Sequence, residues 1–312
     1  MRLAVVPFPD PQFLHEVAGD VAVRTWEGVG DPPPWLDQTT FYVPRYLGGA
    51  QPLRAMASMP RLEVVQTLTA GVDDVWEHLP DGVVLCNARG VHDASTAELV
   101  VGLTIAALRG LPDFVRGQDV GEWRARPHEA LADKRVLLVG YGSVGAAVDR
   151  RLAGFEVEVT RVARSARPGS DPVVQGFEDL GALLPDADVV VLTVPLTTET
   201  RGMVDAAFLA ALHDGALLVN AARGPVVVTD ALVAECASGR LLAALDVTDP
   251  EPLPPNHPLW RLPNVLISPH VGGNTSAFLP RARRLVAEQL RRYAAGEPLD
   301  HVMAPASFRV EG

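Results

Sequence analysis

Three side chains of different chemical kind each follow an apolar run that is typical of a buried strand. They are Arg223, Glu251 and His270, and the runs before them span residues 217–219, 241–245 and 265–268. In an open parallel sheet, ligands bind outside the carboxyl ends of the strands. We therefore expect these three side chains to meet at one sheet edge, although none is close to another in the sequence.

Together these groups could carry out hydride transfer to a 2-oxo acid. Negative charge grows on the ketone oxygen as hydride arrives, and a protonated His270 would hydrogen-bond that oxygen and deliver the proton. Glu251, by accepting from the other ring nitrogen, would fix the tautomer and stabilise the imidazolium. Arg223 offers a planar fork that binds the carboxylate and polarises the carbonyl.

A glycine-rich segment predicts a dinucleotide site beside this chemistry. The apolar run 137–139 leads into Gly140-Tyr141-Gly142-Ser143-Val144-Gly145, which has the pattern G-x-G-x-x-G and precedes a helix-forming segment. The first glycine permits a tight turn, the second lets the backbone approach a pyrophosphate, and the third lets helix and strand pack closely. The helix N-terminus then offers free N–H groups to the phosphates. The alternative is a tight turn that binds no ligand.

Each catalytic candidate also has a plain structural interpretation. An arginine after a strand often forms a surface ion pair, a glutamate between two prolines can be a loop carboxylate, and a histidine can end a strand with hydrogen bonds. His257 is the alternative base, but it falls in a loop before the last expected strand. The catalytic hypothesis therefore rests on the joint occurrence of the three residues beside a dinucleotide loop.

Length and composition set the outer limits of the prediction. A chain of 312 residues exceeds what a single core usually supports, so we expect two domains. A net charge of −11 argues against nucleic acid or an anionic membrane as a partner. Cys86 and Cys236 form no C-x-x-C motif and no metal-ligand cluster, so we expect no metal site and a reduced, cytoplasmic protein. No apolar run approaches the ~20 residues of a membrane span.

Strand and helix patterns alternate through the second part of the chain. The expected strands, several of them without polar alternation, are residues 135–139, 157–162, 188–194, 216–221, 241–247 and 264–268. The expected helices between them are residues 143–152, 205–212 and 229–238. This order predicts an α/β fold with a doubly wound parallel sheet.

The first part of the chain has the same α/β character without the glycine pattern. Its expected strands are residues 3–6, 21–24, 63–68 and 83–86. Ser95-Thr96-Ala97-Glu98 matches a capping box, and it predicts a helix that begins there, continues through residues 99–108 and links the two domains. Residues 111–131 carry Phe114 and Trp123 among charges, which suits an exposed arm or an interface. A final helix, residues 275–295, could return the chain to the first domain.

These motifs resemble those of the D-isomer-specific 2-hydroxyacid dehydrogenase family, from about Gln66 to Pro280. The segments that carry the likeness are Gln66-Thr67-Leu68-Thr69-Ala70-Gly71-Val72-Asp73, Asn87-Ala88-Arg89-Gly90, Pro195-Leu196-Thr197-Thr198-Glu199-Thr200-Arg201-Gly202, Asn220-Ala221-Ala222-Arg223-Gly224, Asp246-Val247 with Glu251-Pro252-Leu253, and Pro269-His270-Val271-Gly272-Gly273. Several independent motifs in the family's order make the resemblance specific.

The resemblance implies roles for particular residues. Arg223, Glu251 and His270 would be the catalytic residues, and the backbone amides of Thr69, Ala70 and Gly71 would hold the substrate carboxylate together with Arg223. The expected cofactor-binding residues lie on loops at the sheet edge and at the start of the linking helix, and they are Thr96, Gly140, Gly142, Ser143, Val144, Gly145, Arg164, Ser165, Arg167, Val194, Pro195, Thr200, Ala221, Ala222, Asp246, His270 and Gly272.

The resemblance also implies how the domains are organised. A doubly wound dinucleotide-binding domain, residues 99–280, would be inserted into a smaller flavodoxin-like α/β substrate-binding domain made of residues 1–98 and 281–312. Members of the family are usually homodimers built around the nucleotide domains, and the arm at residues 111–131 would suit that interface.

The end of the second expected strand bears on the choice of cofactor. NAD-preferring relatives carry an aspartate there that grips the ribose 2′-hydroxyl, whereas this chain has Ala163 followed by Arg164, Ser165 and Arg167. A carboxylate would repel a 2′-phosphate and an arginine fork would bind it. We therefore predict NADP(H) in preference to NAD(H). The alternative is that these arginines face water and NAD binds with one contact fewer.

The segment 246–259 is similar to glyoxylate/hydroxypyruvate reductases in particular. The expected activity is the NAD(P)H-dependent reduction of a small 2-oxo acid to a D-2-hydroxy acid. Phosphoglycerate, phenylpyruvate and phosphite dehydrogenases of the same family are alternatives, as is a cofactor-sensing binding protein. We expect the substrate side chain near Leu53, Leu68, Arg89 and Trp260. Arg89 would either contact a second anionic group or pair with a carboxylate.

Overall fold

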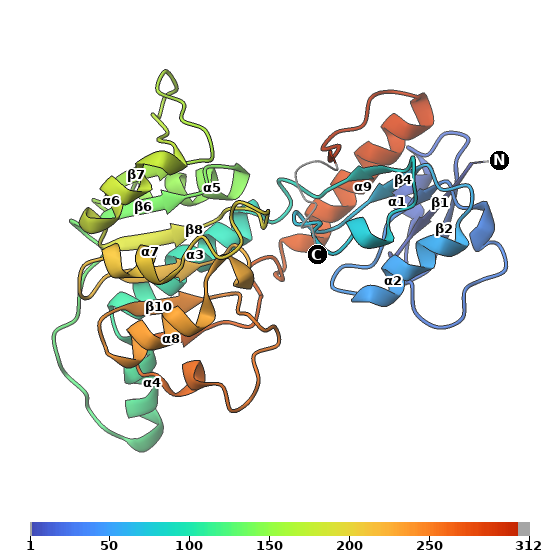
Figure 1. The fold of residues 1–312 in the computed structure, drawn as a ribbon. Coiled ribbons are helices and arrows are strands. Elements are labelled where there is room, and N and C mark those ends of the chain that lie inside the picture. Colours follow the sequence, from blue (N-terminus) through green and yellow to red (C-terminus); the bar gives the residue numbers. More distant parts are fainter. Residues whose placement is uncertain (1, 305–312) are drawn as a thin grey trace. The chain divides into compact units, whose positions relative to one another are not determined.

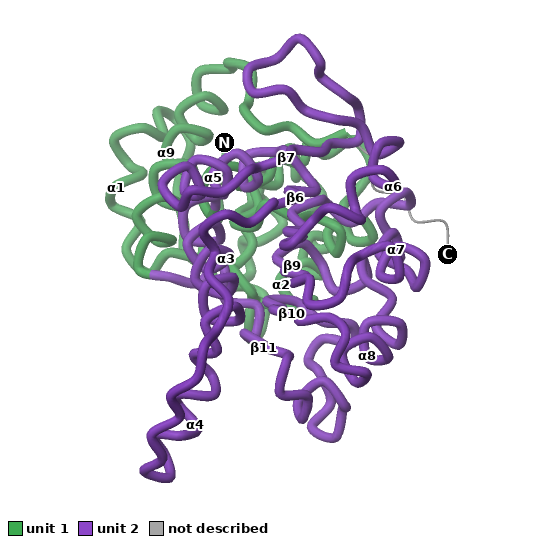
Figure 2. The backbone as a smooth tube through the Cα atoms, turned by 90° about the vertical axis from the view of Figure 1, so that its left-hand side faces the viewer, with its two compact units in different colours: residues 1–92, 276–312 green, residues 93–275 purple. Residues whose placement is uncertain are grey.

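The chain forms two compact units in the computed structural model, which describes residues 2–304. Unit 1 takes the described residues up to His92 and from Ser276 onward, and unit 2 takes Asp93–Thr275 (Figure 2). The predicted boundaries, after residues 98 and 280, fall inside the helices α3 (Asp93–Leu108) and α9 (Phe278–Ala295). Residues 305–312 of the predicted substrate-binding domain lie outside the described residues.

Unit 2 is built on a six-stranded parallel sheet (Figure 1), which confirms the predicted fold class. The strand order is β11-β10-β9-β8-β6-β7. The strands, each within or equal to an expected one, are β6 (Arg135–Val139), β7 (Glu158–Val162), β8 (Val189–Leu192), β9 (Leu217–Asn220), β10 (Leu242–Leu245) and β11 (Val265–Ile267). Neighbours β6 and β8 flank the point where the strand order reverses, which is where such sheets bind ligands.

Helices cover both faces of this sheet, so unit 2 is doubly wound as predicted. Along β6, Val136 and Leu138 pack with α3 and α5, whereas Leu137 and Val139 pack with α7 and α8. Burial on both faces explains why the strands show no polar alternation. The helices of unit 2 besides α3 are α4 (Leu111–Val120), α5 (Ser143–Leu152), α6 (Leu180–Leu183), α7 (Ala206–Ala211) and α8 (Thr229–Ala237).

Helix α3 ends at Leu108 as predicted, but it begins at Asp93, so the capping box predicted at Ser95 is wrong. Ser95 is buried in the first turn, where its hydroxyl hydrogen-bonds the hydroxyl of Thr275 (2.8 Å). Glu98 pairs with Arg151 of α5 (3.5 Å). Ser95 and Glu98 therefore contact residues that are distant in the sequence and do not cap the helix, and a local sequence pattern cannot reveal such contacts.

Unit 1 holds a five-stranded parallel sheet in the order β2-β1-β3-β4-β5. This is the flavodoxin-like order, as the resemblance implied. Helices α9 and α1 (Gln12–His15) pack on one face, and α2 (Ala50–Arg54) packs on the other. The strands are β1 (Leu3–Val6), β2 (Ala22–Thr25), β3 (Phe41–Tyr42), β4 (Val64–Gln66) and β5 (Val84–Cys86). Strand β3 was not predicted, because two residues are too short for a periodic pattern.

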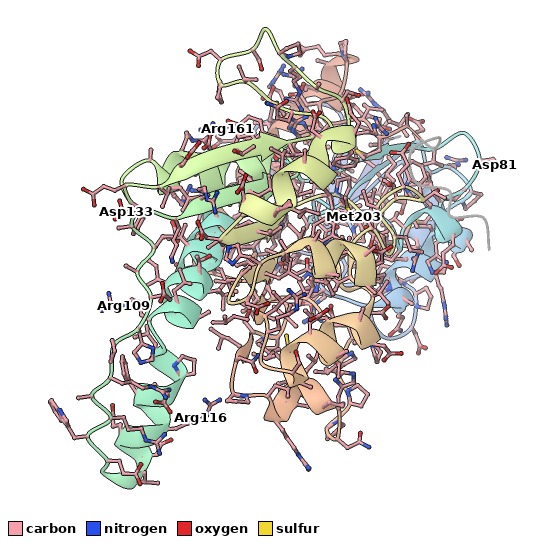
Figure 3. All side chains as sticks on the ribbon, turned by 60° about the vertical axis from the view of Figure 1, so that its left-hand side comes forward. Asp81, Arg109, Arg116, Asp133, Arg161 and Met203 are labelled. Carbon is pink, nitrogen blue, oxygen red and sulfur yellow. The ribbon has the colours of Figure 1, made fainter. Side chains whose placement is uncertain are left out.

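Helix α4 and the coil that follows it extend away from the sheet of unit 2 as an arm, residues 111–131 (Figures 2 and 3). Arg124 and Arg126 of the coil both pair with Asp113 of α4, at 2.8 Å each, and hold the coil along the helix. Its large apolar side chains up to Trp123 are exposed, with Trp123 at 95%, whereas Leu131 at its end is buried. The arm thus has the exposed character predicted for it.

No single helix among residues 2–304 is both long enough and apolar enough to cross a membrane. The pair α3 and α4 reaches that length and composition only jointly, across a bend of 66°.

Candidate active site

The three catalytic candidates lie on loops that follow neighbouring strands of unit 2. Arg223 follows β9, Glu251 follows β10 and His270 follows β11, and these strands are adjacent in the sheet. Because all the pairings are parallel, the loops leave the sheet at one edge. Of the three side chains, the structure brings Glu251 and His270 into direct contact.

Glu251 and His270 form the hydrogen bond that the sequence suggested. The carboxylate of Glu251 accepts a hydrogen bond from Nδ1 of His270 at 2.5 Å. The side chain of His270 is 38% exposed, and its Nε2 has no hydrogen-bond partner among the described residues. A carboxylate on Nδ1 fixes the tautomer, so the free nitrogen can give or take a proton at a bound ligand.

Asp246 holds the backbone that carries His270. His270 has φ at 52°, a left-handed conformation that costs a non-glycine residue about 1–3 kcal/mol and persists only where its surroundings enforce it. The buried Asp246 carboxylate accepts from the Ser268 hydroxyl (2.6 Å) and from the amides of Val271 and Gly272 (2.9 Å each). Its own carbonyl accepts from the His270 amide at 2.8 Å.

Asn220 has the corresponding role in the loop that carries Arg223. Its side chain donates to the carbonyl of Arg223 (3.1 Å) and accepts from the amide of Ala222 (3.0 Å). Gly224 follows directly, and a Cβ there would collide with the carbonyl of Thr248. Only glycine allows the loops after β9 and β10 to pack this closely.

The glycine-rich loop has the shape that a pyrophosphate requires. Gly140 has φ at 108°, and a Cβ there would lie 2.6 Å from the carbonyl carbon of Thr193 in the loop after β8. A Cβ on Gly145 would collide with the carbonyl of Gly140. No side chain caps α5 at Gly142, and the N–H groups at the start of a helix are the ones that bind phosphate.

Tyr141 of this loop is anchored by charged side chains that sequence reasoning missed. Its hydroxyl donates to Asp149 of α5 at 2.7 Å, and Arg161 of β7 binds the same carboxylate with two nitrogens, at 2.8 and 2.9 Å. The hydrogen bonds to Asp149 raise the pKa of the Arg161 guanidinium. Arg167 donates to the carbonyl of Tyr141 at 3.3 Å.

The predicted 2′-phosphate residues lie just beyond β7. Ala163 is buried at the strand end, and Arg164, Ser165 and Arg167 are exposed. Arg164 lies 3.9 Å from Glu199. The side chains of Arg164 and Glu199 are both more than half exposed, so water screens this pair strongly.

The other predicted cofactor contacts also lie on unit 2. Ser143 opens α5 and donates to Asp93 at 3.2 Å, and Thr200 donates to the carbonyl of Pro195 at 2.6 Å. Thr96 lies against Gly272, where an added Cβ would come within 3.3 Å of the threonine side chain. Val194, Ala221 and Ala222 belong to the loops after β8 and β9, and Val144 lies in the first turn of α5.

The predicted carboxylate loop, Thr69-Ala70-Gly71, lies in unit 1 after β4. The carbonyls of Leu68, Thr69 and Ala70 each accept a hydrogen bond from a neighbouring group of unit 1. In the described part of the chain, the amides of Thr69, Ala70 and Gly71 donate to no acceptor. Free amides on consecutive residues are donors of the kind that bind anions.

The remaining residues singled out from the sequence are the alternative base His257, the two cysteines and Arg89. Nδ1 of His257 accepts from the amide of Leu259 at 3.3 Å and caps a short helical turn. Burial raises the pKa of Cys86 to about 11 and of Cys236 to about 12, which leaves both as thiols at neutral pH. Arg89 is exposed, and its side chain pairs with no carboxylate among residues 2–304. Within the same residues no group of three potential metal ligands occurs.

Comparison with known proteins identifies the family. The model of the D-isomer specific 2-hydroxyacid dehydrogenase NAD binding domain matches residues 101–272. The chain belongs to this family. Its members are oxidoreductases, and the match assigns NAD binding to unit 2, where the glycine-rich loop lies.

Glyoxylate and hydroxypyruvate reductases are among the relatives, as the local motifs predicted. The chain is 35% identical to a glyoxylate reductase of Thermofilum pendens over 78% of this chain and 75% of that protein. It is 34% identical to a glyoxylate reductase/hydroxypyruvate reductase of Mus musculus over 78% and 77%. A solved NADPH-dependent glyoxylate/hydroxypyruvate reductase of Sinorhizobium meliloti, in complex with NADP and sulfate, superimposes with a TM-score of 0.81 at 27% identity and 99% coverage of both chains.

The role of Asp246 in this dehydrogenase leads to a prediction. The Asp246 carboxylate accepts hydrogen bonds from three donors. In Asp246→Asn the amide NH₂ would face at least one of those donors, that hydrogen bond would be lost, and the loop that carries His270 would shift. Because each lost hydrogen bond to a buried charged group costs roughly 1.5–3 kcal/mol, we expect kcat for 2-oxo acid reduction to fall about tenfold or more. Asp249→Asn is the control, because it makes the same change at an exposed residue of the loop after β10, in which Asp246 also lies. Unchanged kcat in Asp246→Asn, measured with circular dichroism to confirm folding, would refute this role.

Proposed function

We propose that this dehydrogenase reduces glyoxylate or hydroxypyruvate to the D-2-hydroxy acid with NADPH. The observation that carries the proposal is the Glu251–His270 hydrogen bond, with Nε2 of His270 left for substrate at the edge that also carries the glycine-rich loop. The bound nicotinamide supplies the hydride. His270 donates a proton from Nε2 to the ketone oxygen, and Glu251 holds the ring and stabilises its charged form.

Each unit carries a group that would bind a substrate carboxylate. Arg223 follows β9 in unit 2, where its guanidinium donates to the carbonyl of Ala222 at 2.9 Å, and the amides of Thr69, Ala70 and Gly71 offer hydrogen-bond donors in unit 1. Arg223 would also polarise the carbonyl that receives the hydride. A guanidinium and backbone amides are hydrogen-bond donors, which suits an anionic substrate.

The residues present fit NADP. The amides at the start of α5 would bind the pyrophosphate, for which Gly140 and Gly145 leave no room for side chains. Arg164, Ser165 and Arg167 would bind the 2′-phosphate, and Ala163 replaces the carboxylate that would repel it. The likeness to an NADPH-dependent reductase solved with NADP supports this preference.

Oxidation of phosphoglycerate is a second candidate because of Arg89. This side chain is exposed, close in sequence to the carboxylate loop's partners Asn87 and Ala88, and without an ion pair in the described part of the chain. Such an arginine could bind a second anionic group. Phenylpyruvate and phosphite are the remaining family substrates to compare.

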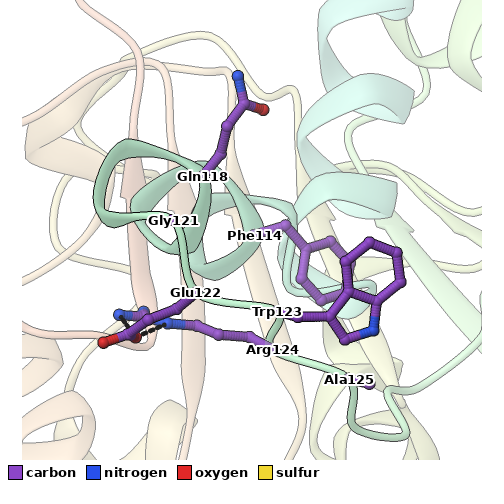
Figure 4. Close-up of a pocket in the computed structure, with 7 residues that line it drawn as sticks. All are labelled: Phe114, Gln118, Gly121, Glu122, Trp123, Arg124 and Ala125. Carbon is purple, nitrogen blue, oxygen red and sulfur yellow. Dashed lines mark hydrogen bonds and ion pairs between the residues drawn. The ribbon is translucent and has the colours of Figure 1, made fainter.

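We also propose that the protein is a homodimer formed through the arm. Phe114, Gln118, Gly121 and Trp123 are among the residues that line a hollow of about 630 Å³ on it (Figure 4). Phe114 is 39% exposed and Trp123 95%, and large apolar groups this exposed mark interaction surfaces. A second copy of the chain is the occupant that the family resemblance suggests.

The activity is tested by absorbance at 340 nm. We expect NADPH oxidation with glyoxylate and hydroxypyruvate, slower oxidation with phenylpyruvate, and little reduction of NADP with phosphoglycerate or phosphite. In His270→Ala, turnover should fall by roughly two orders of magnitude or more while NADPH still binds, because the general acid is lost. No turnover of either oxo acid by the wild type would reject the proposed substrates, and near-full turnover by His270→Ala would reject the role of His270.

Cofactor preference is tested by Arg164→Ala. Because Arg164 would contact only the 2′-phosphate, we expect KM for NADPH to rise about tenfold and KM for NADH to change little, as for loss of a charged hydrogen bond. Arg201→Ala changes an exposed arginine of a different loop and is the control. Equal losses for both cofactors would contradict the assignment.

The dimer is tested by Phe114→Ser with Trp123→Ser. Both side chains are exposed, so the double variant should fold normally and sediment as a monomer at concentrations where the wild type is a dimer. Val302→Ser, which changes an exposed apolar residue of unit 1, should leave the dimer intact. A wild type that sediments as a monomer at micromolar concentration would exclude the proposal.

A further inference from the structure

We propose that His92 is a positioning residue for the carboxylate loop. Nε2 of His92 donates to the carbonyl of Leu68 at 2.7 Å, immediately before Thr69-Ala70-Gly71. The inference rests on the proposed function, in which the amides of this loop bind the substrate carboxylate. His92 touches none of the reacting atoms and acts through the peptide group that it holds.

The argument starts from the geometry of the peptide bond. In a planar trans peptide, the C=O of one residue and the N–H of the next point in opposite directions. When a carbonyl is hydrogen-bonded to a group of unit 1, the N–H of the next residue therefore points away from that group. The carbonyls of Leu68, Thr69 and Ala70 precede the amides of Thr69, Ala70 and Gly71, so three hydrogen bonds set the direction of three donors.

Each of these carbonyls accepts a hydrogen bond from a different part of unit 1. Thr69 accepts from the Thr67 hydroxyl (2.9 Å) and from the amide of Ala88 (2.9 Å), and Ala70 accepts from the side-chain amide of Asn87 (2.7 Å). Leu68 accepts from His92. Thr67, Asn87 and Ala88 lie at strand ends next to the loop, whereas His92 is the donor that orients the first peptide group, and with it the amide of Thr69.

Packing fixes the direction from which His92 donates. The ring is buried, and it stacks on Tyr46 (centroids 5.3 Å apart, planes at 20°) and on Phe278 (5.4 Å, 12°). Tyr46 and Phe278 also contact each other at 4.1 Å. Because Tyr46 and Phe278 contact each other, they pack against the His92 ring together and not from opposite faces, and this packing restricts rotation of the ring and keeps its Nε2–H aimed at Leu68.

Three variants separate positioning from stability. His92→Phe keeps a ring in the stack and removes the donor, His92→Gln restores a donor at a similar reach, and Phe278→Leu loosens the stack and keeps the donor. Thr39→Val is the matched control, because it removes a 2.7 Å hydrogen bond from another buried side chain of unit 1 to a carbonyl, that of Leu36.

We expect His92→Phe to raise KM for the oxo acid about tenfold with kcat within threefold of the wild type, since the loop binds ground and transition states alike. NADPH affinity should not change. His92→Gln should recover most of the loss, Phe278→Leu should raise KM by a smaller factor, and Thr39→Val should leave KM unchanged. Binding of oxalate, measured by calorimetry, should weaken with the same ranking.

The outcomes distinguish this proposal from the proposed function. If the wild type turns over an oxo acid and His92→Phe leaves both KM and oxalate binding at the level of Thr39→Val, the role of His92 is refuted and the activity stands. A parallel loss of kcat, oxo acid affinity and NADPH affinity would show a structural role only and would also refute it. If the wild type turns over no oxo acid, oxalate binding by the same variants still decides whether His92 orients an anion site.

Discussion

Parallel pairing of every strand is the constraint on which the rest of this molecule depends. It sends the chain back over a sheet face after each strand, so helices must cover both faces, and it brings the end of each strand to the same edge. In unit 2 this edge collects a glycine-rich loop, an arginine, a glutamate and a histidine from distant parts of the sequence. Chemistry that needs several kinds of side chain therefore becomes possible without any local cluster.

Buried polar side chains at the ends of the strands fix the conformation of the loops at that edge. Asn220 and Asp246 are the last residue of β9 and the first after β10, and both are almost fully buried. They bond to the backbone of the loops that carry Arg223 and His270, and the tyrosine of the glycine-rich loop is held by Asp149 in a similar way. In unit 1 the loop after β4 is held through its carbonyls. In each case a residue other than the reactive or binding group supplies the rigidity of the loop.

The sequence predicted the parts of this arrangement that local patterns encode. Strand β6 and helix α5 begin and end where expected, because the glycines between them mark the turn from strand to helix. The pairing of Glu251 with His270 followed from their positions after neighbouring strands. The start of α3 was wrong because Ser95 and Glu98 are used in tertiary contacts. The role of His92 could not be found, since its hydrogen-bond partner lies 24 residues earlier and its ring stacks on Phe278 from the other end of the chain. Such roles depend on contacts between distant residues, which no short motif contains.

The insertion of unit 2 within unit 1 has a consequence for how the chain must fold during synthesis. All five strands of unit 1 are made before unit 2 begins, but the helix α9, which buries Ala282, Val286 and Leu290 against one face of their sheet, is made last. That face stays uncovered by its own helix until the ribosome has passed unit 2 entirely. Unit 2 is continuous in sequence and can close its core first, so the N-terminal strands wait in an incomplete state that a chaperone could bind.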